Sequence, residues 1–99
     1  MLQQRPKIFT LTLTAQGTEY PFTVPRAVKK INVQARQSRE IRMAVEAGAT
    51  GVDPYWTLKA DNVYYEDCPL EIKDCVLYFQ DPSNAGTIIE ILAWLEVGA

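Results

Sequence analysis

Apolar and polar residues alternate with a period of two along much of this chain, and this pattern constrains its fold most. The alternation is clearest in residues 9–14, where Phe and Leu alternate with Thr, and in residues 30–36, where Ile31, Val33 and Ala35 alternate with polar or basic residues. Successive side chains of a β-strand point to opposite faces of a sheet. Such alternation therefore indicates strands with one buried face.

Six other segments repeat the pattern or form short apolar runs between turn residues. The predicted strands cover residues 8–14, 20–24, 30–36, 41–47, 55–59, 63–66, 75–80 and 88–97. Residues 41–47 also contain good helix formers, but four consecutive alternations favour a strand. Residues 48–54 form the longest predicted loop. Many short strands without a confident helix predict an all-β protein, an antiparallel β-sandwich of about eight strands that is jelly-roll-like.

The length of 99 residues suits a single domain. Residues 1–7 show no core pattern, so we expect an N-terminal arm that orders on a neighbour, followed by one β-sandwich domain over residues 8–99. Large apolar side chains occupy both faces of segment 88–97. We expect the opposite sheet or a partner to cover each face of this strand.

The net charge of −2 conceals an asymmetry between the two halves of the chain. Residues 1–49 carry eight Lys and Arg against three Asp and Glu, whereas residues 50–99 carry two against nine. The halves therefore have balances of +5 and −7. Two interpretations stay open: opposite charges meet across strands inside the domain, or a polarised surface docks on copies of itself or on an assembly.

The chain has no histidine, and so lacks the commonest general base and a favoured metal ligand. This argues against Ser-His-Asp and Cys-His catalysis and against zinc hydrolysis. Carboxylate pairs remain, Glu66 with Asp67 and Glu71 with Asp74, but each lies where a turn needs polar residues. We therefore expect a protein that is not an enzyme and has no catalytic residues.

We expect no metal and no cofactor. Four acidic residues offer oxygen ligands for Ca²⁺, but their spacing matches no EF-hand loop, and a solvated acidic rim is favoured. These residues are Asp53, Asp61, Glu66 and Asp67.

No segment is apolar over the roughly 20 residues that a membrane span needs, so we expect a soluble protein made in a cytoplasm, with no membrane partner. Cys68 and Cys75 flank six residues and have the spacing to bridge a loop, but a cytoplasmic protein keeps its thiols reduced. Unpaired thiols are the favoured interpretation.

Adjacent aromatic residues on a strand point to opposite faces, so one residue of Tyr55 and Trp56, and one of Tyr64 and Tyr65, should leave the core. Exposed Tyr and Trp side chains anchor protein interfaces. The polar face of segment 30–36 has no aromatic residue for base stacking, so we expect no nucleic-acid partner. The candidate interface residues are Tyr55, Trp56, Tyr64, Tyr65, Trp94, Arg36, Arg39 and Arg42.

Several short runs resemble small all-β virion proteins of tailed bacteriophages. They are residues 22–25 (FTVP), 31–36 (INVQAR), 55–60 (YWTLKA), 77–80 (LYFQ) and 89–94 (IEILAW). The resemblance implies a structural subunit of the virion, a capsid decoration or cement protein, with a tail or neck component as the alternative. It implies a homo-oligomer, a dimer or trimer, that binds the major capsid protein or another virion protein after synthesis in the host bacterial cytoplasm.

A function of another class also fits the sequence. The Tyr and Trp content is compatible with a carbohydrate-binding module on a jelly-roll scaffold, in which a row of exposed aromatic side chains stacks on sugar rings. A free-standing chain of this length makes that alternative secondary.

Overall fold

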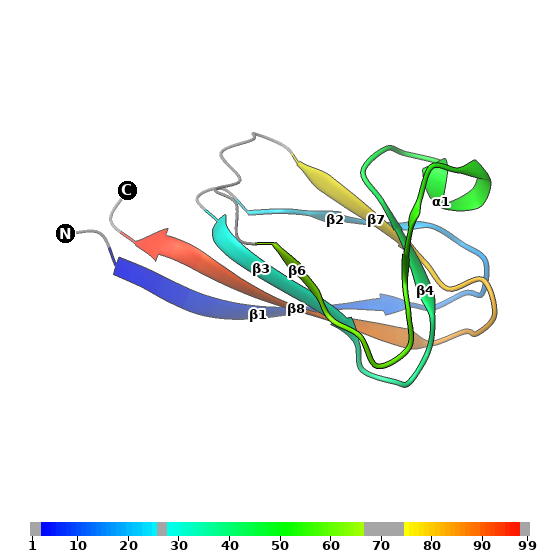
Figure 1. Cartoon of the computed structure of the whole chain (residues 1–99), viewed down its shortest axis with the longest axis horizontal. Helices are drawn as coiled ribbons and strands as arrows, with labels where there is room; N and C mark the ends of the chain where they lie inside the picture. The colour runs from blue at the N-terminus through cyan, green and yellow to red at the C-terminus, as the bar shows by residue number, and fades with distance from the viewer. Residues whose placement is uncertain (1–2, 26–27, 67–74, 98–99) are drawn as a thin grey trace.

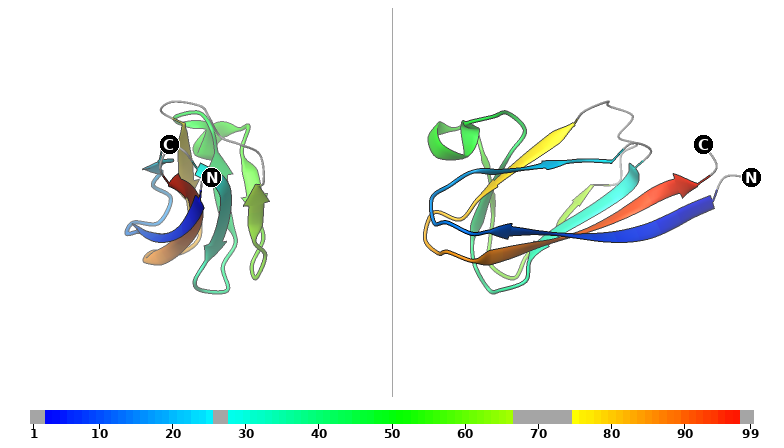
Figure 2. Two further views of the ribbon diagram at one scale, coloured as in Figure 1. Left: turned by 90° about the vertical axis from the view of Figure 1, so that its left-hand side faces the viewer. Right: turned by 180° about the vertical axis from the view of Figure 1, so that it is seen from behind.

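The computed structural model describes residues 3–25, 28–66 and 75–97, which form eight strands and one short helix. The strands form two sheets that pack face to face (Figures 1 and 2). The elements are β1 Gln3–Leu13, β2 Tyr20–Thr23, β3 Val28–Ala35, β4 Ile41–Ala44, α1 Ala49–Val52, β5 Trp56–Leu58, β6 Tyr64–Glu66, β7 Val76–Gln80 and β8 Thr87–Val97.

The strand order shows how the chain is rolled up. One sheet has the order β1-β8-β3-β6 and the other has the order β2-β7-β4-β5. Strands β1 and β8, β2 and β7, β3 and β6, and β4 and β5 all pair antiparallel, as if one long hairpin had been folded over on itself. The contacts of β8 with β3 and of β7 with β4 complete the sheets. This order of eight strands in two sheets is a jelly roll, so the predicted fold class is confirmed.

The core lies between the two sheets and is built from the alternating residues of each strand. Ile31 and Val33 of β3 are buried, and so are Ile89, Ile91 and Ala93 of β8. Burying an aliphatic side chain of this size stabilises a fold by about 1.5–3 kcal/mol. All eight predicted strands exist, because this inward-facing half of each pattern had to be removed from water.

The aromatic side chains of β1 and β2 join the two sheets along one side. The rings of Phe9 and Phe22 meet edge to face, with centroids 5.5 Å apart, and both pack against the core. Phe9 belongs to the alternating segment from which the first strand was predicted.

Strand β1 begins at Gln3, five residues earlier than the alternation predicts. Residues 3–7 of the expected N-terminal arm are therefore part of the sheet, with Gln3 opposite Val97 at the far end of β8. Backbone hydrogen bonds to β8 hold this stretch, and such bonds need no apolar pattern. Figures 1 and 2 show β1 and β8 running side by side to the end of the molecule where β1 begins and β8 ends.

Strand β4 ends at Ala44, three residues earlier than predicted, and Val45 is exposed. The chain then bends into α1, which lies within the predicted loop 48–54. Gly48, with a φ of 83°, sits at the start of this helix in a left-handed conformation that glycine adopts without strain.

Helix α1 is held by Glu19, from the loop between β1 and β2. The Glu19 carboxylate accepts hydrogen bonds from the Gly48 N–H at 2.8 Å, the Thr50 N–H at 3.3 Å and the Thr50 hydroxyl at 2.5 Å. Burial raises the pKa of Glu19, but the hydrogen bonds from Thr50 and Gly48 outweigh it, so the pKa lies below its usual 4.5.

The corner between β7 and β8 is organised by Asp81, a fully buried residue. One carboxylate oxygen accepts hydrogen bonds from the backbone N–H groups of Ser83 and Asn84, both at 2.9 Å, and the other accepts one from the Thr87 hydroxyl at 2.5 Å. The buried charge is thus surrounded by donors, which is the condition for burying a carboxylate at acceptable cost.

We expect the Asp81→Ala variant to lose about 1–3 kcal/mol of unfolding free energy, because its three donors lose their acceptor inside the protein. Urea denaturation gives the measurement, with Glu40→Ala as an exposed acidic control that should stay near wild type. Equal midpoints for the two variants would contradict this role of Asp81.

We expect Glu19→Gln to destabilise the protein by about 1 kcal/mol at neutral pH. Because the pKa of Glu19 is lowered in the folded state, its contribution is present above pH 4.5 and disappears as the pH falls through the lowered value. The stability difference from wild type should therefore shrink in acid. Thermal unfolding across this pH range tests it, and exposed Glu46→Gln should show no such convergence.

Candidate functional site

The structure separates the two predicted aromatic pairs as expected. Trp56 and Tyr65 are 62% and 55% exposed, whereas Tyr55 is half-buried and Tyr64 packs against the core. Trp94 is half-buried on the outer face of β8, between Pro6 on β1 and Lys30 on β3. Only Trp56 and Tyr65 of the five candidate aromatic residues thus offer most of their surface to a partner.

The three candidate arginines all have partners within the chain. Arg36 pairs with Glu90, with its Nε at 2.9 Å from Oε2. Arg39 donates to the Ala85 carbonyl and the Thr87 hydroxyl, at 3.2 and 3.0 Å. Arg36 and Arg39 therefore stabilise contacts within the sandwich. Arg39 does so at the corner that Asp81 organises.

Arg42 is used in the same way. It donates to the Thr50 carbonyl at 3.1 Å, and its guanidinium lies over the Tyr55 ring, 4.4 Å from the centroid. Such a stacked guanidinium makes a cation–π contact. Arg42 and Tyr55 therefore connect β4 to α1 and to the start of β5, rather than forming a free surface.

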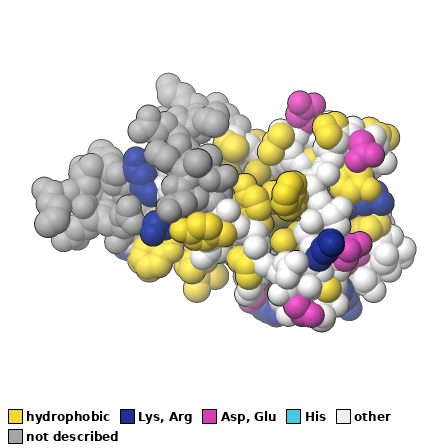
Figure 3. All heavy atoms as spheres, in the orientation of Figure 1, with side chains coloured by type: hydrophobic (Ala, Val, Ile, Leu, Met, Phe, Trp, Pro, Cys, Tyr) yellow, Lys and Arg dark blue, Asp and Glu magenta, His cyan; other side chains and the backbone are white. Residues whose placement is uncertain are grey.

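The exposed aromatics meet at one edge of the sandwich, where β5 of one sheet lies near β6 of the other. A depression of about 720 Å³ lies here, the edge hollow, and its lining includes Trp56, Lys59, Asn62, Val63 and Tyr65. Figure 3 looks onto this side of the molecule and shows hydrophobic side chains across the middle of the surface. The two aromatic residues lie on consecutive strands, β5 and β6, which belong to different sheets and are joined by a short loop.

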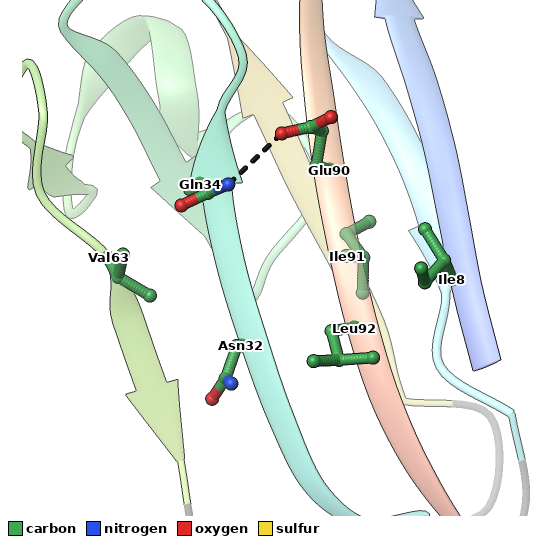
Figure 4. Close-up of a pocket in the computed structure, with 7 residues that line it drawn as sticks. All are labelled: Ile8, Asn32, Gln34, Val63, Glu90, Ile91 and Leu92. Atoms are coloured by element: carbon green, nitrogen blue, oxygen red, sulfur yellow. Dashed lines mark hydrogen bonds between the residues drawn. The ribbon is translucent and has the colours of Figure 1, made fainter. Parts of the chain in front are cut away.

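A second depression, the sheet-face hollow, lies on the outer face of the β1-β8-β3-β6 sheet and has a volume of about 320 Å³ (Figure 4). Its apolar lining comes from Ile8, Val63, Ile91 and Leu92. Its polar lining comes from Asn32, Gln34 and Glu90. Val63 lines both hollows, so they adjoin.

Strand register explains the geometry of the sheet-face hollow. Ile8, Leu92, Asn32 and Tyr65 are direct cross-strand neighbours on β1, β8, β3 and β6, and so form one row across the sheet. Glu90 and Gln34 are opposite each other in the next row. Side chains in such rows share a face and contact each other. The hollow is therefore the space between a row in which Ile8 and Leu92 form an apolar wall beside Asn32, the apolar row, and the row of Gln34 and Glu90, the polar row.

The polar row carries little net charge. Gln34 Nε2 donates to Glu90 Oε1 at 3.0 Å, and Arg36 takes the other carboxylate oxygen. The hydrogen bonds from Arg36 and Gln34 hold the pKa of Glu90 below its usual 4.5, so Glu90 is ionised at neutral pH and balanced by Arg36.

Asn32 stands out because its Oδ1 is buried and has no hydrogen-bond partner among the described residues. Neither of its cross-strand neighbours, Leu92 and Tyr65, carries an amide or a charged group. The sequence placed Asn32 and Gln34 on the outer face of their strand but gave no reason to single them out. Only the register with β6 and β8 reveals their surroundings.

The acidic residues and cysteines considered as possible ligands or catalytic groups do not form a cluster in the described part of the chain. No three acidic or cysteine residues there lie close enough to hold a metal ion. Asp53 is exposed, and Asp61 accepts a hydrogen bond from the Ser38 hydroxyl at 2.8 Å. Cys75 is half-buried against the core. The positions of Asp67, Cys68, Glu71 and Asp74, and the side chain of Glu66, lie outside the described residues.

Within residues 3–25, 28–66 and 75–97, no helix has the length and apolar character required to cross a membrane. Comparison of the chain with protein-family models, curated proteins and solved structures gives no match.

We expect the pKa of Glu90 to rise toward its usual value in an Arg36→Gln variant, because the largest cause of its depression is the hydrogen bond from Arg36. Side-chain NMR titration of wild type and variant measures both values. Lys30→Gln removes a cation from the same face without touching this pair, and should leave the Glu90 pKa unchanged. An unchanged Glu90 pKa in Arg36→Gln would contradict the conclusion that Arg36 lowers it.

Proposed function

We propose that this protein is a non-enzymatic structural subunit of a bacteriophage particle, a capsid decoration or cement protein that docks on other virion proteins and on copies of itself. The phage origin comes from the sequence runs that resemble small all-β virion proteins. A tail or neck location is the alternative within the same class.

The main structural support for docking is the edge hollow. Trp56 and Tyr65 are mostly exposed and share one depression with Val63, which is 52% exposed. Aromatic side chains are enriched in the cores of protein interfaces, and a few such anchors supply most of the binding energy. A subunit that stabilises a particle needs such an anchor on a rigid scaffold, and the jelly roll supplies the scaffold.

The long outer edge of β1 is a less suitable docking site. Lys7 and Pro6 lie on this edge strand, and Arg5 is next to them. Lysine and proline on an edge strand discourage pairing with another sheet. This contrast favours docking through side chains at the edge hollow over sheet extension through β1.

The composition of purified particles provides the first test. Mass spectrometry of virions purified from the phage that carries this gene should detect the chain in a fixed copy number per particle. Size-exclusion chromatography with light scattering should give a dimer or trimer. A strictly monomeric protein that is absent from particles would overturn the proposal.

We expect Trp56→Ala to weaken binding to particles about 30-fold, since truncating a hot-spot aromatic costs about 2 kcal/mol. A co-sedimentation assay with particles that lack the protein measures this binding. Val45→Ala is the matched control, because Val45 is 70% exposed but does not line the edge hollow. Equal losses for both variants, or no loss for either, would exclude the edge hollow as the docking surface.

A further inference from the structure

We infer that the sheet-face hollow is a binding site for a neutral saccharide, with the amide oxygens of Asn32 and Gln34 as acceptors for its hydroxyl groups. This site adjoins the proposed docking surface and shares Val63 with it, but the inference does not depend on the virion role.

The hollow offers acceptors more than donors. Gln34 has committed its Nε2 to Glu90, so its own carbonyl oxygen stays available. Figure 4 shows this oxygen pointing toward the side of the hollow where Val63 lies, and the Asn32 oxygen pointing to the same side. The lone pairs of Glu90 that Arg36 and Gln34 do not occupy add to the set. A ligand for this site must therefore carry several hydrogen-bond donors.

Asn32 needs a hydrogen-bond donor that no described residue provides. Its Oδ1 is buried without a partner among the described residues, which is a costly state for an amide oxygen. The χ2 torsion of asparagine is soft, so a small rotation turns this oxygen into the hollow. A bound hydroxyl would then provide the missing donor.

The charge of the hollow selects among donor-rich ligands. Glu90 is paired with Arg36 at 2.9 Å, so a metal cation or an ammonium group would meet the guanidinium as well as the carboxylate. A neutral ligand meets no such opposition. Three oxygen acceptors without a net charge match sugar hydroxyls better than they match a cation.

The apolar row completes the match with a saccharide. Ile8 is 71% exposed and Leu92 lies beside it, opposite Asn32, so that an aliphatic wall borders the amide groups. A sugar ring has hydroxyl groups around its edge and C–H groups on its faces, and so needs both kinds of neighbour. The volume of about 320 Å³ is at the small end of ligand sites, suitable for one or two sugar units.

The position of Asn32 and Gln34 argues against a peptide strand as the ligand. Extended peptides add to the unpaired edge of a sheet through their backbone groups. Both amides lie on β3, which is paired with β8 on one side and β6 on the other. A ligand on this face must contact side chains rather than backbone, as a saccharide does.

The test is a titration of the isotope-labelled full chain with glucose, galactose, mannose and N-acetylglucosamine, followed by amide NMR. Glycerol serves as a polyol that is not a sugar. We expect saturable shifts at residues 32–34 and 90–92 with at least one sugar, with a dissociation constant of about 1 mM. The absence of saturable shifts with all four sugars, or an equal response to glycerol, would overturn the inference.

Asn32→Leu distinguishes a binding role from a structural one. Replacing an unsatisfied amide by an apolar group should leave the thermal midpoint unchanged or raise it. In the same variant, sugar affinity should fall about tenfold or more, as expected for losing a hydrogen bond to the ligand. Lys30→Ala, on the same strand face but outside the hollow, is the matched control and should keep wild-type affinity. Wild-type affinity in Asn32→Leu would overturn the inference.

Discussion

The antiparallel pairing of the first half of the chain with the second half is the constraint on which the whole structure depends. Strand β8 is paired on both sides, with β1 and with β3, and its inward residues Ile89, Ile91 and Ala93 are fully buried. Strand β7 has the corresponding position in the other sheet, between β2 and β4. The rows of side chains that form the sheet-face hollow follow from the register that β8 imposes on β1 and β3.

This pairing explains the charge asymmetry of the sequence. The basic and acidic halves do not occupy separate regions, because each sheet alternates strands from the first half with strands from the second. Arg36 on one side and Glu90 on the other show the outcome, an ion pair across neighbouring strands. The sequence leaves two interpretations of the asymmetry open. At this pair the structure shows the first, opposite charges that meet inside the domain.

The sequence predicts the fold well because the core depends on a pattern that can be read locally. Alternation at Ile31 and Val33 reports directly which face of β3 is buried, and the same holds for most of β8. The errors occur where tertiary contacts decide the structure. The alternation at Val45 continues past the end of β4, but Glu19, distant in sequence, holds the chain in α1 instead.

The candidate sites are harder to predict for the same reason. That one of Tyr64 and Tyr65 would be exposed follows from strand geometry, but the depression that it shares with Trp56 does not. Arg39 and Arg42 look like surface residues in the sequence, and only the structure shows them bound to carbonyl groups of the β7–β8 corner and of α1. Asn32 could not be singled out at all, since an unpartnered amide is a property of its neighbours.

The contact between β1 and β8 has a consequence for how the protein acquires its structure. Because the partners of β1 and β3 include β8, the β1-β8-β3-β6 sheet has no complete form until residues 87–97 have been synthesised. Pairings between strands this distant in sequence are slow to form, since chain entropy is lost before any contact is gained. The apolar faces of β1 and β3 have their full neighbours in the sheet only once β8 has paired with both strands. The completion of this sheet therefore depends on the pairing of β8, the last of its strands along the chain.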